Sequence, residues 1–177
     1  MDLMAPFTGT LYMPDKEFLN PVSDVLLPDG RPVAGVRWHA WTRRFEILDT
    51  GGAVIAECQG RGVFTVRYTV TLMNGRTALT LKPSAWRAFN GAQITLGSGR
   101  QLGMRQLSIW SERKFEFYGP EGTVGQILPT TGAFSFRPDS YAFEIGLPVM
   151  SALEAIGLAQ AIRLVVRAQR QRRSANT

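Results

Sequence analysis

Five arginines near the C-terminus are the side chains whose spacing most clearly predicts a binding chemistry. They lie within the last fifteen residues, which contain no acidic side chain: Arg163, Arg167, Arg170, Arg172 and Arg173. The first three fall at i, i+4 and i+7, so a helix would present them on one face. Such a cluster indicates an anionic partner, which could be lipid headgroups, nucleic acid or an acidic protein surface. The same residues also suit the negative end of a helix dipole without any partner.

Candidate catalytic and metal-binding residues are few. The chain has one histidine, His39, and one cysteine, Cys58. A metal site needs three or four convergent ligands, and a Ser-His-Asp triad would have to use His39. The run Gly97-x-Gly99-x-x-x-Gly103 lacks the spacing of a dinucleotide fingerprint and the helix that must follow one. We therefore expect no enzymatic activity, no metal and no cofactor, and read His39 as a strand-end residue packed by aromatic rings.

The net charge of +6 is unevenly distributed. Residues 1–60 hold five basic and eight acidic side chains, whereas residues 61–177 hold fifteen and six. A pI near 10.1 would suit nucleic acid. However, the excess is concentrated at the C-terminus, and aromatic and basic residues do not interleave as they do in single-strand binders. We therefore rank nucleic acid below a lipid or protein partner.

The N-terminal sequence lacks the basic and apolar regions of a signal peptide. The single cysteine suits a reducing compartment. The expected location is therefore the cytoplasm, with peripheral attachment to the inner face of a membrane.

The residues before position 148 show the period-two alternation of strands with one buried face. The alternating apolar sets are Phe64 to Leu72, Leu79 and Leu81, Ile94 and Leu96, Leu107 and Ile109, Phe134 and Phe136, and Tyr141 to Ile145. Turn signals separate them, and Asn74-Gly75 between two strands strongly indicates a hairpin. Short strands with frequent turns predict an all-β sandwich or barrel.

A helix is expected at about 148–168, and it is apolar nearly all round. Such a helix must be surrounded by protein or by lipid. Residues 147–166 are long enough to span a bilayer, but Glu154 and Arg163 would each cost about 2.5–3.5 kcal/mol at its centre. About ten to twelve strands can be read along the chain. We therefore favour a closed antiparallel β-barrel that encloses the C-terminal helix.

An internal repeat supports this architecture. Residues 43–47 match residues 113–117 at an offset of 70, and Gly52 and Val54 match Gly122 and Val124 at the same offset. Each copy has the pattern of a strand, a glycine turn and a strand, which suggests two related β-meanders in one closed sheet. Arg44 and Glu46 would be charged neighbours on the outer face.

Four segments together resemble the tubby C-terminal-like superfamily, and within it the LURP-one-related and phospholipid-scramblase-like branch. They are RRFEILDTGGAVIAE (43–57), RKFEFYGPEGTVGQI (113–127), DSYAFEI (139–145) and MSALEAIGLAQAIRLVV (150–166). The resemblance covers about residues 25–166. It implies a twelve-stranded β-barrel around a hydrophobic C-terminal helix. Tubby domains bind phosphoinositide headgroups, scramblase-like members associate with membranes, and many bacterial members have no assigned activity.

The expected organisation has three parts: an N-terminal arm at 1–18, the barrel with its central helix at 19–166, and a basic tail at 167–177. The expected function is a non-enzymatic, membrane-associated module of a bacterial protein that binds anionic phospholipid headgroups through the five arginines. The alternative is an accessory subunit of a membrane-associated complex, which would use the barrel surface and the basic tail for docking.

Overall fold

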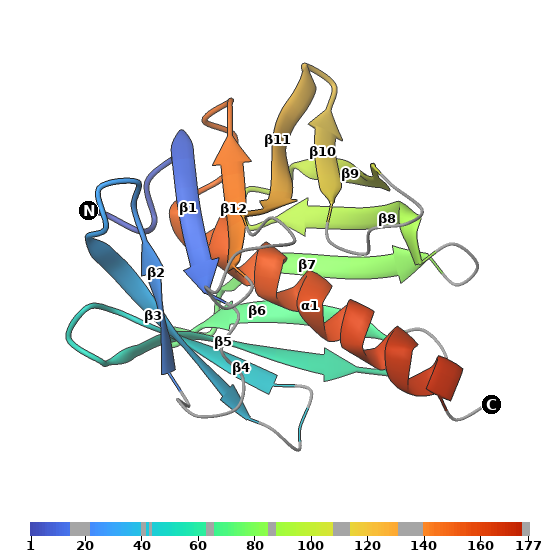
Figure 1. Cartoon of the computed structure of the whole chain (residues 1–177), viewed down its shortest axis with the longest axis horizontal. Coiled ribbons are helices and arrows are strands. Elements are labelled where there is room, and N and C mark those ends of the chain that lie inside the picture. The colour runs from blue at the N-terminus through green and yellow to red at the C-terminus, as the bar shows by residue number, and fades with distance from the viewer. Residues whose placement is uncertain are drawn as a thin grey trace.

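The fold is a closed barrel of twelve antiparallel strands with one helix packed inside it (Figure 1). This confirms the closed β-barrel that the alternating strands and the apolar helix together predicted. The computed structural model describes residues 1–14, 22–39, 42, 44–62, 66–84, 88–107, 114–130 and 140–174. The strands are β1 (Gly9–Pro14), β2 (Val22–Leu26), β3 (Pro32–His39), β4 (Arg44–Leu48), β5 (Val54–Arg61), β6 (Arg67–Leu72), β7 (Thr77–Ser84), β8 (Ala88–Leu96), β9 (Gln101–Gln106), β10 (Phe115–Gly119), β11 (Gly122–Pro129) and β12 (Ser140–Ile145), and the helix is α1 (Ala152–Ser174).

The first and last strands close the barrel. β1 pairs with β12 along its whole length, from Gly9 opposite Ile145 to Pro14 opposite Ser140. Residues 9–14 are therefore part of the barrel, and the predicted N-terminal arm at 1–18 is wrong over this stretch. The strand was missed because its buried pair, Leu11 and Met13, is too short an alternation to stand out in the sequence.

The alternating side chains point as predicted in most of the described strands. Tyr68 and Val70 are buried in β6, and Phe143 and Ile145 are buried in β12. An exception lies at Leu107, which is 43% exposed and follows the end of β9. β9 instead buries its earlier pair, Leu102 and Met104. Phe64, Ile109, Phe134 and Phe136 lie outside the described residues.

Glycine between Leu102 and Met104 hid the β9 alternation, and the fold explains why glycine stands there. Gly103 lies opposite Tyr118 of β10, and a Cβ at Gly103 would lie 2.4 Å from the Tyr118 ring. Gly103 therefore lets the Tyr118 ring lie flat on the outer face. The Gly97–Gly103 run thus consists of a turn and the first half of a strand, with no helix after it.

Hairpin turns of one geometry gather at the barrel end that we call the turn end. In four of them a glycine N–H donates to the carbonyl oxygen three residues earlier: Gly30 to Leu27, Gly52 to Asp49, Gly75 to Leu72 and Gly99 to Leu96. Gly75 has a φ of 83°, which an L side chain rarely adopts. The hairpin predicted at Asn74-Gly75 is therefore confirmed. The opposite end, where β3 and β7 stop at His39 and Ser84, we call the exit end.

The internal repeat occupies opposite sides of the barrel. Its two copies are the hairpins β4–β5 and β10–β11, which are six strands apart in an order of twelve. Both carry a register shift at the same repeat position, between Ile47 and Leu48 and between Phe117 and Tyr118. Phe45 and Phe117 are both fully buried. The sequence repeat thus corresponds to an approximate twofold relation between the barrel halves.

Helix α1 begins inside the turn end and emerges at the exit end (Figure 1). Its residues are buried from Ala152 to Val165 apart from Arg163, which is half-buried, and it packs against β4, β6 and β7. Within the described residues, no helix combines the length and the apolar character that crossing a membrane requires.

A capping box sets the start of α1 four residues later than predicted. The Glu154 N–H donates to Ser151 Oγ at 3.2 Å, and Glu154 Oε2 accepts from the Ser151 N–H at 2.7 Å, which is the reciprocal pattern of a helix N-terminus. Glu154 Oε1 also accepts from the Gly97 N–H at 2.9 Å. The N-terminal segment adds a further cap, because the Leu153 N–H donates to the Leu3 carbonyl oxygen.

The end of α1 also differs from the prediction. The helix continues to Ser174, whereas the sequence predicted an end near 168 and a separate tail at 167–177. Residues 167–173 contain only arginine, glutamine and alanine. These are strong helix formers, and no glycine or proline stops the helix there. The basic residues are therefore part of one continuous helix as far as Ser174.

The centre of α1 approaches the barrel wall closely at Gly157. A Cβ on Gly157 would lie 2.9 Å from a methyl group of Val70, a side chain that is itself fully buried. Glycine inside a helix costs about 1 kcal/mol relative to alanine. Close packing against β6 offsets this cost.

We expect Gly157→Ala to lower the free energy of unfolding by about 1 kcal/mol, because overpacking against a stiff valine outweighs the gain in helix propensity. Urea denaturation measures the effect. Val70→Ala in the same chain should relieve the overlap, so the double variant should lose less than the sum of the two single variants. A Gly157→Ala protein more stable than the wild type would contradict this packing.

Candidate functional site

The exit end brings the first of the predicted arginines between two aromatic rings. The Arg163 guanidinium carbon lies 4.8 Å from the ring centroid of Trp38 and 5.9 Å from that of Tyr141. Trp38 comes from β3 and Tyr141 from β12, so residues more than one hundred positions apart meet on one helical side chain. Both distances are within the range of cation–π attraction, which is stronger where water is excluded. We call this group the exit cluster: Trp38, Tyr141, Gln160 and Arg163.

A buried amide links Arg163 to the interior of the barrel. Arg163 donates from one terminal nitrogen to Gln160 Oε1 at 2.8 Å, and Gln160 Nε2 donates to the Met13 sulfur at 3.4 Å. Gln160 is only 2% exposed, so its amide depends on partners within the protein. The two residues together place a polar chain where the apolar helix leaves the barrel.

The five arginines differ in their surroundings. Arg163 is half-buried, and its described contacts are aromatic rings and an amide. Arg167, one turn further, is half-buried as well, and Arg170 is exposed. Arg172 and Arg173 lie in the helix, but their side chains are outside the described part of the chain. The side chains of the first three therefore run from the barrel wall toward solvent.

Sequence reasoning did not predict the charged network on the outer face of β3, β4 and β5. Glu46, expected at the surface with Arg44, is only 7% exposed. It accepts from Arg37 at 3.1 Å and from Arg44 at 2.9 Å, and Arg44 also binds Glu57 at 2.9 Å. Glu46 and Glu57 lie directly opposite in the sheet, where two like charges repel. A shared guanidinium between them removes that repulsion.

His39 belongs to this network. It is the last residue of β3, as predicted for a strand end, and its Nε2 lies 3.2 Å from Glu46 Oε1. The sequence signal for this contact was weak, because it depends on the register of β3 against β4. Glu46, which His39 approaches, already binds two arginines. The surroundings of His39 are therefore those of a structural charge network.

The second repeat carries a simpler version of the same arrangement. Glu116, at the repeat position of Glu46, accepts hydrogen bonds from Arg105 and from the Thr123 hydroxyl. The Arg105 hydrogen bond is the main reason that the pKa of Glu116 is lowered. This carboxylate is therefore ionised at neutral pH and serves as an ion-pair partner between β9 and β10.

The remaining candidate residues of the described part of the chain are the Cys58 thiol and the possible metal ligands. Burial raises the pKa of Cys58 to about 12, with a smaller contribution from the neighbouring Glu57 charge. A thiol with that pKa is protonated at neutral pH and is a poor nucleophile. No group of three or more His, Cys, Asp or Glu side chains converges among the described residues.

One solved structure has the same fold as this chain. It is the X-ray structure of a protein from Arabidopsis thaliana, with a TM-score of 0.59 and 14% sequence identity, over 94% of each chain. At this identity the likeness shows the fold alone. No family model and no curated protein matches the sequence. The resemblance to one branch of the tubby-like superfamily therefore stays a prediction.

We expect Cys58 to be unreactive toward 5,5′-dithiobis(2-nitrobenzoate) in the native protein at pH 8, because its thiol is buried and almost wholly protonated. After denaturation in guanidinium chloride the same chain should react with one equivalent of reagent, since it has one cysteine. The absorbance of the released thionitrobenzoate measures the reaction in both the native and the denatured protein. Rapid labelling of the native chain would show that the barrel opens around β5.

Replacing Arg163 should destabilise the exit end. We expect Arg163→Met to lose about 1–2 kcal/mol of unfolding free energy, because it removes the cation–π contact and leaves Gln160 without a donor. Arg163→Lys keeps the charge and should lose less. The matched control is Arg170→Met on the exposed side of the same helix, which should stay within about 0.5 kcal/mol of the wild type. Equal losses for Arg163→Met and Arg170→Met would contradict the role of the exit cluster.

Proposed function

We propose that this protein is a non-enzymatic binding module that attaches peripherally to anionic phospholipid surfaces through the basic end of α1. The observation that carries the proposal is the exposure along the helix, which changes from fully buried residues before Arg163 to half-buried Arg167 and exposed Arg170. The positive charges are thus presented on a continuous helix that is anchored in the barrel.

The anchoring supports the proposal because it lowers the entropic cost of binding. A basic residue on a loose segment must be ordered when it meets a surface, whereas Arg167 and Arg170 are held on a helix whose preceding three turns are buried in the barrel. Each basic residue near an anionic membrane contributes about 1 kcal/mol. Several such residues together would give reversible attachment that depends on ionic strength.

A direct test is co-sedimentation with vesicles of phosphatidylcholine alone and of phosphatidylcholine with phosphatidylglycerol. We expect binding to the anionic vesicles only, with a loss at high salt. The double variant Arg167→Gln/Arg170→Gln should weaken binding about thirtyfold, which corresponds to about 2 kcal/mol. The control Arg31→Gln/Arg100→Gln has the same net charge but changes two arginines at the turn end, and it should bind like the wild type.

The outcomes separate lipid binding from docking to a protein. Equal retention on neutral and anionic vesicles, or equal weakening by the control pair, would remove the proposal. A wild-type chain that ignores both vesicles but co-purifies with one acidic protein at fixed stoichiometry would favour the accessory-subunit alternative. In that case the Arg167→Gln/Arg170→Gln variant should lose the partner protein.

A further inference from the structure

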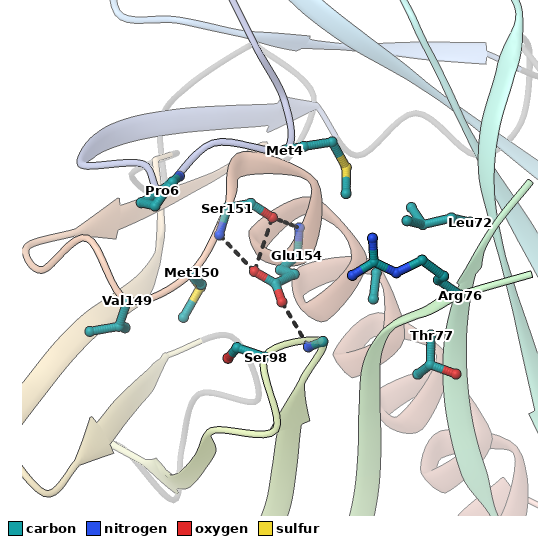
Figure 2. A pocket seen from close by; sticks show the side chains of 12 residues that line it. Met4, Pro6, Leu72, Arg76, Thr77, Ser98, Val149, Met150, Ser151 and Glu154 are labelled. Carbon is teal, nitrogen blue, oxygen red and sulfur yellow. Dashed lines mark hydrogen bonds between the residues drawn. The ribbon is translucent and has the colours of Figure 1, made fainter. Parts of the chain in front are cut away.

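A cavity of about 280 Å³, shown from close by in Figure 2, opens at the turn end of the barrel, where α1 begins. Four segments form it: the N-terminal residues around Met4, the β6–β7 turn, the β8–β9 turn and the start of α1. Hydrogen bonds join three of these segments, because Glu154 accepts from the Gly97 N–H and the Leu153 N–H donates to the Leu3 carbonyl oxygen.

The wall of the cavity is mainly apolar, with two charged groups. Its apolar side chains are Met4, Pro6, Leu72, Val149 and Met150. The Glu154 carboxylate is satisfied, because its two oxygens accept from the Gly97 N–H, the Ser151 N–H and the Ser151 hydroxyl. Its negative charge is therefore compensated by donors at the positive end of the helix.

The other charged group is Arg76, and its charge is not compensated in this way. Figure 2 shows its side chain reaching from the β6–β7 turn into the cavity, toward Glu154. Within the described part of the chain the guanidinium takes part in none of the ion pairs, and Glu154 has other donors. The cavity thus combines an apolar wall with one cationic hydrogen-bond donor.

We infer that this cavity binds a small amphiphilic monoanion, namely a carboxylate with a short alkyl chain. The carboxylate would bind the Arg76 guanidinium, which presents a planar pair of donors to such a group. The alkyl chain would lie against Met4, Leu72 and Met150, and methionine adapts well to ligands of irregular shape. The volume of about 280 Å³ is roughly nine times the ~30 Å³ of one water molecule, so a carboxylate with a short alkyl chain has room there.

The chemistry of the wall favours this class over others. A cationic amphiphile would meet Arg76 with like charge. A phosphate dianion carries two charges, whereas the cavity offers one guanidinium, so a monoanion matches its charge better. A neutral alcohol would fill the apolar wall but leave the guanidinium without a charged partner. The inference does not rest on lipid binding by α1, because the two sites lie at opposite ends of the barrel.

Isothermal titration of the full chain with octanoate tests the inference, with octan-1-ol and octylamine as ligands of matched chain length. We expect saturable binding of octanoate at one site, at least tenfold tighter than either comparison ligand. Arg76→Gln should weaken octanoate binding about tenfold, and Met4→Ser should weaken it about threefold. The amide resonances of Gly97 and Ser98 should shift on addition of octanoate, which locates the site.

Controls make the result specific to the cavity. Arg31→Gln removes an exposed arginine from another turn of the same end, and Arg167→Gln/Arg170→Gln removes charge from α1; both should bind octanoate like the wild type. Thermal unfolding shows whether Arg76→Gln keeps the fold. No saturable binding below about 5 mM, or the same affinity for the wild type and a folded Arg76→Gln variant, would overturn the inference. If the wild-type protein binds octanoate but does not bind anionic vesicles, the result counts only against the proposal that α1 binds lipid.

Discussion

The structure depends on one constraint, which is that α1 is too apolar to stand in water and the barrel is too wide to stand empty. The helix buries Ala152 through Ile162 without an exposed face, and twelve strands form a larger ring than their own side chains can fill. Each element therefore supplies the surface that the other needs. Closure between β1 and β12 also removes the open edges that a twisted sheet would expose. Because helix and sheet stabilise each other, the few polar groups on α1 must be placed where the barrel can satisfy them.

Those polar groups mark the two ends of the barrel. At the turn end, Glu154 ties the helix start to the β8–β9 turn through the Gly97 N–H. At the exit end, Gln160 and Arg163 form a chain from the Met13 sulfur to the Trp38 and Tyr141 rings. Between them the helix is apolar, and at Gly157 it lies so close to Val70 that no side chain fits without displacement. The translation and the rotation of α1 relative to the barrel are thus set by one close approach, at Gly157, and by polar contacts at each end.

Charged groups on the outer face of the sheet differ in their contacts from those at the two ends of the barrel. The outer-face carboxylates Glu46 and Glu116 are held by arginines of neighbouring strands, so they mainly support the sheet. The turn end combines the capped helix start with a cavity that Arg76 enters. The exit end carries the basic turns of α1, where Arg167 and Arg170 approach solvent. The two ends of the barrel therefore present different chemistry, an apolar cavity with one guanidinium at the turn end and arginines on a helix at the exit end.

The sequence by itself determined the class of fold, because local periodicity carries that information. Alternation in β6 and β12, the Asn74-Gly75 turn and an all-round apolar helix favour a β-structure that closes around a helix. Only the tertiary structure decided that residues 9–14 complete the barrel and that Glu46 lies in a charge network. It also placed Arg163 between Trp38 and Tyr141, so that one arginine of a uniform cluster became an anchor. These features depend on strand register and on contacts between residues far apart in the chain, whereas the spacing of residues along a chain specifies only which neighbours share a face.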